Sequence, residues 1–321
     1  MKFLIIGAAG FVGGHLIDAI AQNSDNVIFA TKLPVEQVAD PRCKVVDLDI
    51  CDADAVLRVM RETKPDRIVH LAAQSSVAVS WKNPRLTANV NIMGTVNILE
   101  AMRGAAPEAR LLSVGSGEEY GAVTPAQCPV TEDTPLRPVN YYAVTKVCTE
   151  QTALHYAKAF GLHIVVTRSF NHFGPRQSDI FVMADFCKQA AAISLGLREP
   201  VIRTGNLSAK RDFTDVRDIV RAYLLLLEKG TAGEVYNVGS GHAQVISDLL
   251  VRIRQLSGAE FSVVTDPARF RPVDVPLIEA NIEKLQRDTG WAPEYHTDQT
   301  IADTLRYWRA QLTGEQNACK S

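Results

Sequence analysis

Short apolar runs alternate along the chain with segments whose apolar positions recur at helical spacing. The runs have the length and composition of buried parallel strands, and they lie at residues 3–6, 27–30, 45–50, 66–71, 110–114 and 235–238. Helical segments are expected at 16–20, 52–61, 89–99 and 213–227. This alternation predicts an α/β fold with a Rossmann-like, doubly wound parallel sheet.

The first apolar run leads directly into a glycine-rich turn. Gly7, Gly10 and Gly13 follow it with G-x-x-G-x-x-G spacing, and a helical pattern comes next. Glycines let the backbone turn sharply and approach a ligand, while the helix N-terminus offers unpaired N–H groups to a pyrophosphate. A glycine triplet also serves plain turns. Its position at a strand-to-helix junction nevertheless indicates a dinucleotide site, which also includes Phe11 and Val12.

The ends of the following strands refine the cofactor prediction. An acidic residue at the end of the second strand would bind the ribose 2′-hydroxyl of NAD. Thr31 and Lys32 stand there instead, and a hydroxyl with a cation favours the 2′-phosphate of NADP, although a solvated lysine is common at a strand end. Beyond the fourth strand, Leu71 is followed by Ala72 and Ala73, whose small side chains let the backbone lie against the cofactor.

A polar cluster follows the fifth strand, at the edge where ligands bind in an open α/β sheet. It runs from Gly115 to Gly121 and contains Ser116. Further along, Tyr142 and Lys146 are four residues apart, on one face of a predicted helix. An ammonium one turn away lowers the pKa of a tyrosine and makes the phenol a usable acid or base near neutral pH. Together these side chains predict a Ser-Tyr-Lys catalytic group.

Length, composition and charge exclude several other functions. The 321 residues suit two domains, and 46% hydrophobic with 22% charged residues is ordinary for a globular protein. A net charge of -2 gives no basis for nucleic-acid binding. The six cysteines lack paired C-x-x-C spacing, which argues against a metal site and for a reduced, cytoplasmic setting. No run resembles a signal peptide or a membrane span.

With these motifs in order, the chain resembles the extended short-chain dehydrogenases/reductases that act on nucleotide sugars, over nearly its full length. The segments 167–177, 203–207 and 210–218 are similar to the GDP-mannose branch, which includes GDP-4-keto-6-deoxymannose reductases and GDP-mannose 4,6-dehydratases. The resemblance implies NADP(H) as cofactor, with NAD(H) as an alternative, and a GDP-sugar as substrate.

The resemblance also implies residues that contact the adenine and the sugar. Asp49 and Ile50 match the acidic-hydrophobic pair that lies beside the adenine ring, although Asp49 fits equally well as a loop acid. Asn171 matches a residue that contacts the first phosphate or positions the sugar.

Basic side chains are expected at the substrate diphosphate. Arg211 and Arg271 match positions that hold the diphosphate or ribose, and a guanidinium fork meets phosphate oxygens in bidentate fashion. Glu279 corresponds to a nucleotide-binding position. Arg176 and Lys188 are weaker candidates, because an isolated cation usually belongs to the surface.

Two reactions fit the motifs, and the reductase is favoured. In a reductase, hydride from NADPH reaches C4 of the keto sugar while Tyr142, with Ser116 and Lys146, protonates the oxygen, which yields a GDP-6-deoxyhexose of the GDP-D-rhamnose type. In a dehydratase, Tyr142 is the base and Glu118 takes the C5 proton. Gly117 lacks the side chain that dehydratases show there. A UDP-sugar epimerase and a non-catalytic cofactor sensor are less favoured alternatives.

The two expected domains interleave. Residues 1–168 form the dinucleotide-binding domain, to which the chain returns near 213–241, and residues 169–212 and 242–321 form the nucleotide-sugar domain. The helices at 89–100 and 142–157 carry surplus apolar surface, which suits a homodimer joined by a four-helix bundle, as in relatives.

Overall fold

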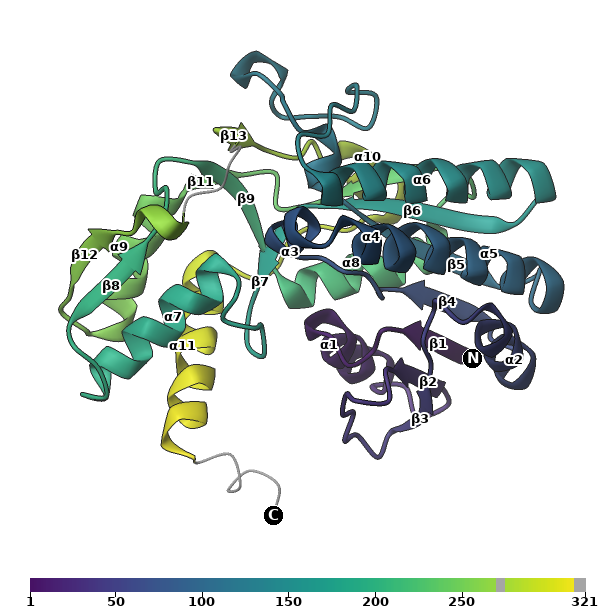
Figure 1. Ribbon diagram of the computed structural model, residues 1–321, viewed down its shortest axis with the longest axis horizontal. Helices are drawn as coiled ribbons and strands as arrows, with labels where there is room; N and C mark the ends of the chain where they lie inside the picture. The colour runs from purple at the N-terminus through teal and green to yellow at the C-terminus, as the bar shows by residue number, and fades with distance from the viewer. Residues whose placement is uncertain (270–274, 315–321) are drawn as a thin grey trace.

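The computed structural model describes residues 1–269 and 275–314 and contains a central sheet of seven parallel strands (Figure 1). The strand order is β10-β6-β5-β4-β1-β2-β3, so it reverses between β1 and β4. The strands are β1 (Lys2–Ile6), β2 (Val27–Lys32), β3 (Cys43–Asp47), β4 (Arg67–His70), β5 (Arg110–Ser116), β6 (His163–Ser169) and β10 (Val235–Val238). The expected doubly wound α/β sheet is confirmed.

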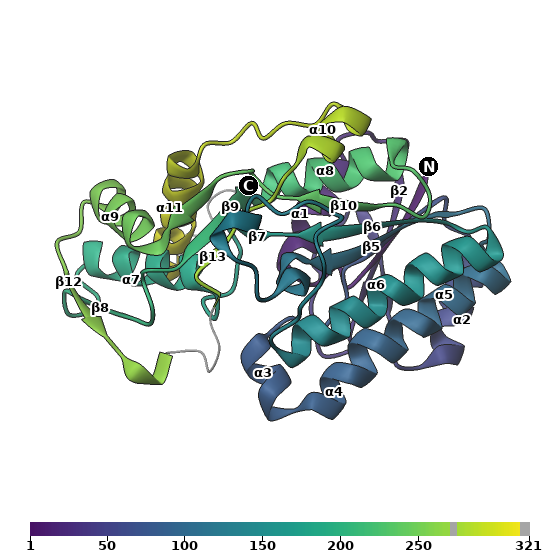
Figure 2. The ribbon, with the colours of Figure 1, turned by 90° about the horizontal axis from the view of Figure 1, so that it is seen from above.

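Helices cover both faces of this sheet (Figure 2). One face carries α1 (Phe11–Ile20), α8 (Val216–Lys229) and α10 (Glu283–Thr289), and the other carries α2 (Ala53–Thr63), α5 (Gly94–Ala105) and α6 (Tyr141–Phe160). Along β1, Phe3 and Ile5 enter the first core while Leu4 and Ile6 enter the second. Burial on both faces is why this strand is a continuous apolar run.

Short elements complete the cofactor-domain side. They are α3 (Val77–Lys82), α4 (Pro84–Ala88), the π-helical turn η1 (Asn89–Met93), and the 3-10 turns η2 (Gly117–Tyr120) and η3 (Pro125–Gln127). The helix expected at 89–99 is therefore divided, because a π-helical turn precedes α5. In that turn Asn91 is buried, and its side chain bonds to both backbone groups of Gln74 and to the Thr145 hydroxyl.

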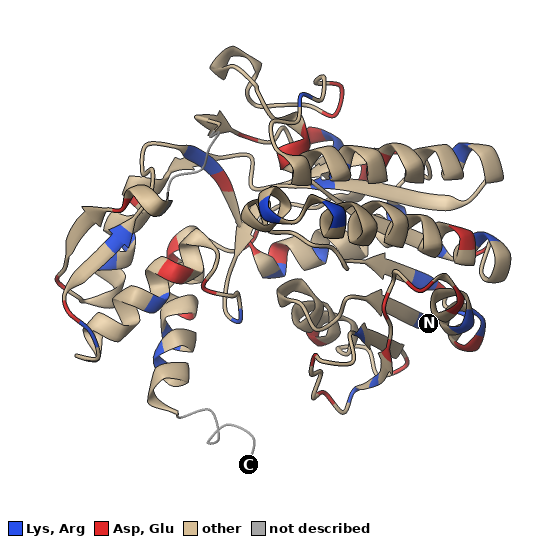
Figure 3. Ribbon diagram, viewed as in Figure 1, with Lys and Arg blue, Asp and Glu red and all other residues tan. Residues whose placement is uncertain are grey.

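A second domain packs around its own core. It contains α7 (Val182–Ser194), α9 (Ile246–Ser257) and α11 (Thr297–Thr313), the sheet of β7 (Asn171–Phe173), β9 (Lys210–Asp215), β11 (Ala243–Val245) and β13 (Leu277–Ile278), the pair β8 (Val201–Thr204) with β12 (Ser262–Thr265), and the turn η4 (Pro267–Arg269). Positive and negative residues are interspersed over both domains in the view of Figure 3. In the described part of the chain, no helix has both the length and the apolar character that a membrane crossing requires.

Three expected boundaries were wrong. Residues 213–215, expected to begin a helix, belong to β9, because Phe213 packs edge-on against Phe173 in the core of the second domain. Helix α8 begins only after Asp215, which caps it. Strand β3 ends at Asp47, before the expected residue 50. Residues 283–291, assigned to the second domain, pack on α8 and β10, because Leu285 and Trp291 are buried in the first core.

Candidate active site

A cavity of about 1430 Å³ lies along the carboxyl ends of the sheet strands, between the two domains. Its walls include eighteen of the predicted site residues, from both domains. These are Gly7, Gly10, Phe11, Val12, Gly13, Thr31, Lys32, Asp49, Ile50, Leu71, Ala72, Ala73, Ser116, Glu118, Tyr142, Lys146, Asn171 and Arg211. The cavity also lies at the reversal of strand order, which is where open α/β sheets bind ligands.

The glycine turn is shaped by close backbone approaches. Gly7 has φ +88°, and a Cβ there would lie 2.7 Å from the Ala72 backbone. A Cβ on Gly13 would lie 2.2 Å from the carbonyl oxygen of Ala8. Helix α1 begins after Gly10 without a side-chain cap, so the N–H groups of its first turn remain available to an anion such as a pyrophosphate.

The far end of the predicted dinucleotide groove contains one cation and one hydroxyl. Lys32 pairs with Asp47 at 2.5 Å, and its Nζ also donates to the carbonyl of Leu33. The Thr31 hydroxyl is buried and accepts the Gly7 N–H at 3.2 Å, so it also supports the glycine turn. The Lys32 side chain is only 13% exposed whereas that of Asp47 is 60% exposed, so a phosphate reaching this end would meet an ammonium that the protein holds in place.

The expected adenine pair lies in the loop after β3. Asp49 accepts the backbone N–H of Cys51 at 2.9 Å, which makes it a turn-forming acid as well as a wall of the cavity. Ile50 is buried, and its carbonyl accepts a hydrogen bond from Asn97. A Cβ on Gly94 would lie 2.5 Å from Ile50 Cδ1, so the absence of a side chain at residue 94 allows Ile50 its position.

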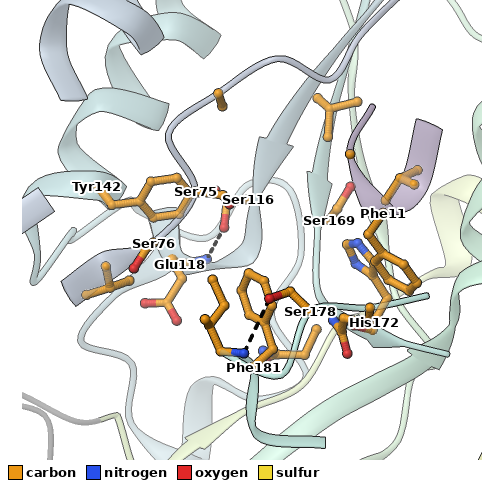
Figure 4. A pocket seen from close by; sticks show the side chains of 18 of the residues that line it. Phe11, Ser75, Ser76, Ser116, Glu118, Tyr142, Ser169, His172, Ser178 and Phe181 are labelled. Atoms are coloured by element: carbon orange, nitrogen blue, oxygen red, sulfur yellow. Dashed lines mark hydrogen bonds between the residues drawn. The ribbon is translucent and has the colours of Figure 1, made fainter. Parts of the chain in front are cut away.

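The Ser-Tyr-Lys group is assembled from β5 and α6, with Glu118 of η2 beside it (Figure 4). Ser116 ends β5; its hydroxyl accepts the Glu118 N–H at 3.2 Å and is hydrogen-bonded to the Tyr142 phenol. Lys146 is buried and donates to the carbonyl oxygen of Val114 at 2.7 Å. In Figure 4 Ser116, Glu118 and Tyr142 lie on one side of the cavity, opposite Phe11 and His172. This grouping places an acid-base side chain beside two polar neighbours.

In this structure the pKa of the Tyr142 phenol is raised rather than lowered. Burial raises the pKa of Tyr142, and the charges of Glu119 and Glu118 raise it further, while the hydrogen bond to Ser116 opposes this rise. The Lys146 ammonium donates to the Val114 carbonyl and does not offset this rise. The phenol is therefore held in its protonated form at neutral pH.

Two residues that hold Tyr142 in place were missing from the predicted site. Asn140 caps α6 by accepting the Ala143 N–H at 2.8 Å, and its amide also donates to a Glu118 oxygen at 3.0 Å. The Ser80 hydroxyl accepts the Tyr142 N–H at 3.2 Å. An asparagine just before an apolar helical run signals a cap, so Asn140 had a local signal. Ser80 had none, because its contact joins residues that are distant in sequence.

The predicted substrate residues divide into two groups. Asn171 on β7 and Arg211 on β9 line the cavity, and the Arg211 side chain also donates to the Lys210 carbonyl. Glu279 does not line it, because its carboxylate accepts the N–H of Ala243 at 2.8 Å and links the end of β13 to β11. Arg271 lies outside the described residues.

The two weaker candidates are engaged in ion pairs. Arg176 has φ 76° and lines the cavity, and its guanidinium bonds to Asp18 and His15 on α1. Lys188 pairs with Asp179 at 2.6 Å and is not part of the cavity wall. Arg176 thus connects the second domain to the helix that follows the glycine turn.

Aromatic packing adds a contact that the motifs did not indicate. The rings of Phe11 and His172 stack with centroids 6.1 Å apart and planes inclined by 11°. Burial lowers the pKa of His172, so the ring is neutral at physiological pH. This stack joins the start of α1 to β7 of the second domain.

An open parallel sheet with a glycine turn at its switch point, joined by a second domain across the cavity, is the arrangement of the extended short-chain dehydrogenases/reductases. The family described as GDP-mannose 4,6 dehydratase matches residues 4–304, and the chain belongs to this family. It is 33% identical over 314 residues to the GDP-6-deoxy-D-mannose reductase of Pseudomonas aeruginosa, covering 98% of this chain and 99% of that protein. It is 30% identical to the GDP-mannose 4,6-dehydratase of Sinorhizobium fredii, covering 83% and 81%.

Solved structures agree with this assignment. The structure of RMD from Pseudomonas aeruginosa complexed with NADPH matches with a TM-score of 0.86 and 31% identity, covering 97% of this chain and 99% of that one. The UDP-glucose 4-epimerase of Thermotoga maritima matches with a TM-score of 0.89 and 28% identity, covering 97% and 100%. The protein is thus an enzyme of a family whose relatives include nucleotide-sugar reductases, dehydratases and epimerases.

Proposed function

We propose that the protein uses NADPH to reduce the 4-keto group of GDP-4-dehydro-6-deoxy-D-mannose, which yields a GDP-6-deoxyhexose of the GDP-D-rhamnose type. The observation that carries the proposal is the position of the Tyr142 phenol at the cavity wall, together with Ser116 and with Lys146 one helical turn away. Reduction of a ketone requires a proton donor next to the carbonyl oxygen, and a phenol in this position can supply that proton. The match to a reductase over nearly the whole length of both proteins also supports reduction as the reaction.

In this proposal the cavity binds two ligands side by side. The first turn of α1 holds the dinucleotide diphosphate, Lys32 with Thr31 faces the adenosine ribose and its 2′-phosphate, and Ile50 lies beside the adenine. NADPH, when bound, supplies the hydride. Arg211 and Asn171 hold the GDP-sugar from the second domain, where a guanidinium suits the diphosphate.

The side chains of this chain then have separate tasks. Tyr142 donates its phenolic proton to the developing alkoxide at C4. The Ser116 hydroxyl, already bonded to the phenol, orients the same carbonyl oxygen. Lys146 holds the nicotinamide ribose and supplies positive charge near the phenol. Fixed proximity of the reacting groups makes the main contribution to rate.

Elimination is a second candidate, because Glu118 is present at the wall. Its carboxylate faces the cavity beside Ser116 (Figure 4) and is held by the Asn140 amide. A carboxylate there is positioned to take a C5 proton, as a 4,6-dehydratase requires. Relatives of both kinds match this chain at similar identity.

One pair of incubations separates the two reactions. With the 4-keto sugar and NADPH, we expect loss of absorbance at the nicotinamide wavelength and one GDP-6-deoxyhexose formed for each NADPH consumed. With GDP-mannose and no added reductant, we expect no 4-keto product. Rapid formation of that product, together with no NADPH oxidation in the first incubation, would show that the protein catalyses elimination and not reduction.

We also propose that two copies associate through α5 and α6. Large apolar side chains are exposed on neighbouring segments there, with Trp81 49%, Leu86 44%, Met93 49% and Val144 38% exposed. Apolar groups gathered on one surface are typical of an interface. Light scattering of the purified protein tests this association, since a monomer at micromolar concentration contradicts it.

A further inference from the structure

Three acidic residues recur at three-residue spacing where the chain passes from the second domain back to the first. They are Asp212 and Asp215 on β9 and Asp218 in the first turn of α8. Strands β7 and β9 lie between the two domains (Figures 1 and 2). All three acidic residues are buried, with at most 3% of their surface exposed. Buried carboxyl groups need hydrogen-bond donors, so their partners indicate what they do.

Two of these carboxyl groups bind segments that connect the domains. Three such crossings are residues 239–242, between β10 and β11, residues 279–282, between β13 and α10, and residues 292–296, which lead to α11. Asp212 accepts hydrogen bonds from the first two crossings, and Asp218 accepts backbone N–H groups of the third. The carboxyl groups therefore fasten the crossings to β9 and α8.

Four donors surround the Asp212 carboxyl group. Its Oδ1 accepts the N–H and the hydroxyl of Ser240 at 2.7 and 2.6 Å, and its Oδ2 accepts the N–H groups of Gly241 at 3.0 Å and Ala280 at 3.2 Å. A Cβ on Gly239 would lie 3.0 Å from Oδ2, so the crossing runs close to the carboxyl. Burial raises the pKa of Asp212, and these hydrogen bonds oppose the rise. Because all four partners donate, they fit an ionised carboxylate, which only accepts.

Residues next to these contacts form part of the cavity wall. Successive side chains of a strand point to opposite faces, so Arg211 lines the cavity while Asp212 faces the crossings. Arg211 is in register with Ile278 of β13, which also lines the cavity and comes two residues before Ala280. The contact between Asp212 and Ala280 therefore fixes two wall residues on neighbouring strands.

We propose that Asp212 is a positioning residue for the nucleotide sugar, which fastens two interdomain crossings to β9 and so holds Arg211 in the wall that faces the cofactor site. The inference rests on the proposed function, in which Arg211 binds the substrate diphosphate. Asp218 fastens the third crossing away from the cavity wall and has a structural role alone.

Asp212→Asn keeps the shape of the side chain but replaces one acceptor by an NH₂ donor. Whichever way the amide turns, at least one of the three backbone N–H groups then faces a donor. A displaced Arg211 loses a charge-assisted hydrogen bond to the diphosphate, so we expect the Kd for GDP to rise about tenfold. Calorimetry on the NADPH-loaded enzyme measures this Kd. The Kd for NADPH should be unchanged, because its wall is formed by β1, β2 and the glycine turn of the first domain.

Asp218→Asn is the matched control for this experiment. Asp218 is as fully buried as Asp212, and it accepts the N–H groups of Glu294 and Tyr295 at 3.1 and 3.0 Å. Both variants should lower the urea midpoint of unfolding, but only Asp212→Asn should weaken GDP binding. If Asp212 only stabilised the fold, both variants would lose stability and both would keep the wild-type Kd for GDP.

Two further variants test whether Asp212 acts through the crossing and through Arg211. Ser240→Ala removes one of the four donors and leaves the backbone N–H in place, so we expect a smaller rise in the Kd for GDP than in Asp212→Asn. In an Arg211→Ala background, Asp212→Asn should raise this Kd no further, because both changes remove the contact of one guanidinium. A second rise of about tenfold would show that Asp212 acts on another part of the site.

The outcomes distinguish this inference from the proposed function. If the wild type binds GDP but does not reduce the 4-keto sugar, the proposed function fails while the Kd values still test Asp212. If it binds UDP instead of GDP, the same variants are compared with UDP, which carries the same diphosphate. If Asp212→Asn folds and keeps the wild-type Kd, the role given to Asp212 is wrong and the proposed function stands. Should Asp212→Asn fail to fold, an unchanged Kd in Ser240→Ala is sufficient to overturn the inference, and a wild type that binds neither nucleotide overturns both proposals.

Discussion

A single methyl group added at Gly13 tests whether the glycine turn is a binding device or only a tight turn. In Gly13→Ala the new Cβ would lie 2.2 Å from the Ala8 carbonyl oxygen and 2.6 Å from two further backbone atoms of Ala8. Ordinary contact begins near 3.4 Å, so α1 must move by about 1 Å relative to β1. Overpacking of this kind destabilises the folded state by about 1–3 kcal/mol. Replacing a glycine within a helix stabilises it by only about 1 kcal/mol, so we expect a net loss of stability.

The same shift should weaken cofactor binding. The first-turn N–H groups of α1 would be displaced, and a hydrogen bond to a charged group contributes about 1.5–3 kcal/mol. Loss of one such bond corresponds to a tenfold to hundredfold rise in the Kd for NADPH, measured by fluorescence titration, with stability followed by urea unfolding.

Gly14→Ala is the matched control for this experiment. Its Cβ would meet only the end of the flexible Arg176 side chain, at 3.1 Å. We expect a Kd close to that of the wild type and an unfolding midpoint at or slightly above it, because alanine is favoured over glycine within a helix by about 1 kcal/mol. If Gly13→Ala binds NADPH as tightly as Gly14→Ala and unfolds at the same urea concentration, the clash does not constrain the turn and the reasoning is refuted.

Three further predictions concern the acid, the cofactor choice and the buried ion pair. Tyr142→Phe should lower kcat about 10²–10⁴-fold with an unchanged Kd for NADPH. Because burial raises the pKa of Tyr142, the wild-type rate should be constant through neutral pH and fall only in alkali; a fall below pH 7 would contradict this. Lys32→Ala should raise the Kd for NADPH about tenfold or more and leave the Kd for NADH almost unchanged. An equal rise in both Kd values would show that Lys32 does not bind the 2′-phosphate. Arg168→Met should destabilise the fold by about 3–5 kcal/mol, because it leaves Glu150 buried without a partner; unfolding curves should show partial recovery in the double variant with Glu150→Gln, and no recovery would show that the loss comes from packing.

The sequence of neighbouring residues along the chain was sufficient to predict much of the fold and of the candidate site. The first strand, the glycine turn and the first helix follow one another along the chain. The spacing from Gly7 to Gly13 was therefore sufficient to predict a tight strand-to-helix turn. Tyr142 and Lys146 lie one helical turn apart whatever surrounds them, so their common face followed from spacing alone. Ser116 was found because a strand of a parallel sheet must end at the ligand edge.

Tertiary contacts determined the pKa values and the contacts of these residues. The pKa of Tyr142 depends on burial and on two carboxyls, and Glu279 faces Ala243 rather than the cavity, which no local pattern encodes. Residues 213–215, expected in a helix, belong to strand β9 because Phe213 packs against residues that are distant in sequence. Helical period and glycine turns arise from neighbours along the backbone, whereas burial, charge balance and strand pairing arise from groups that only the folded chain brings together.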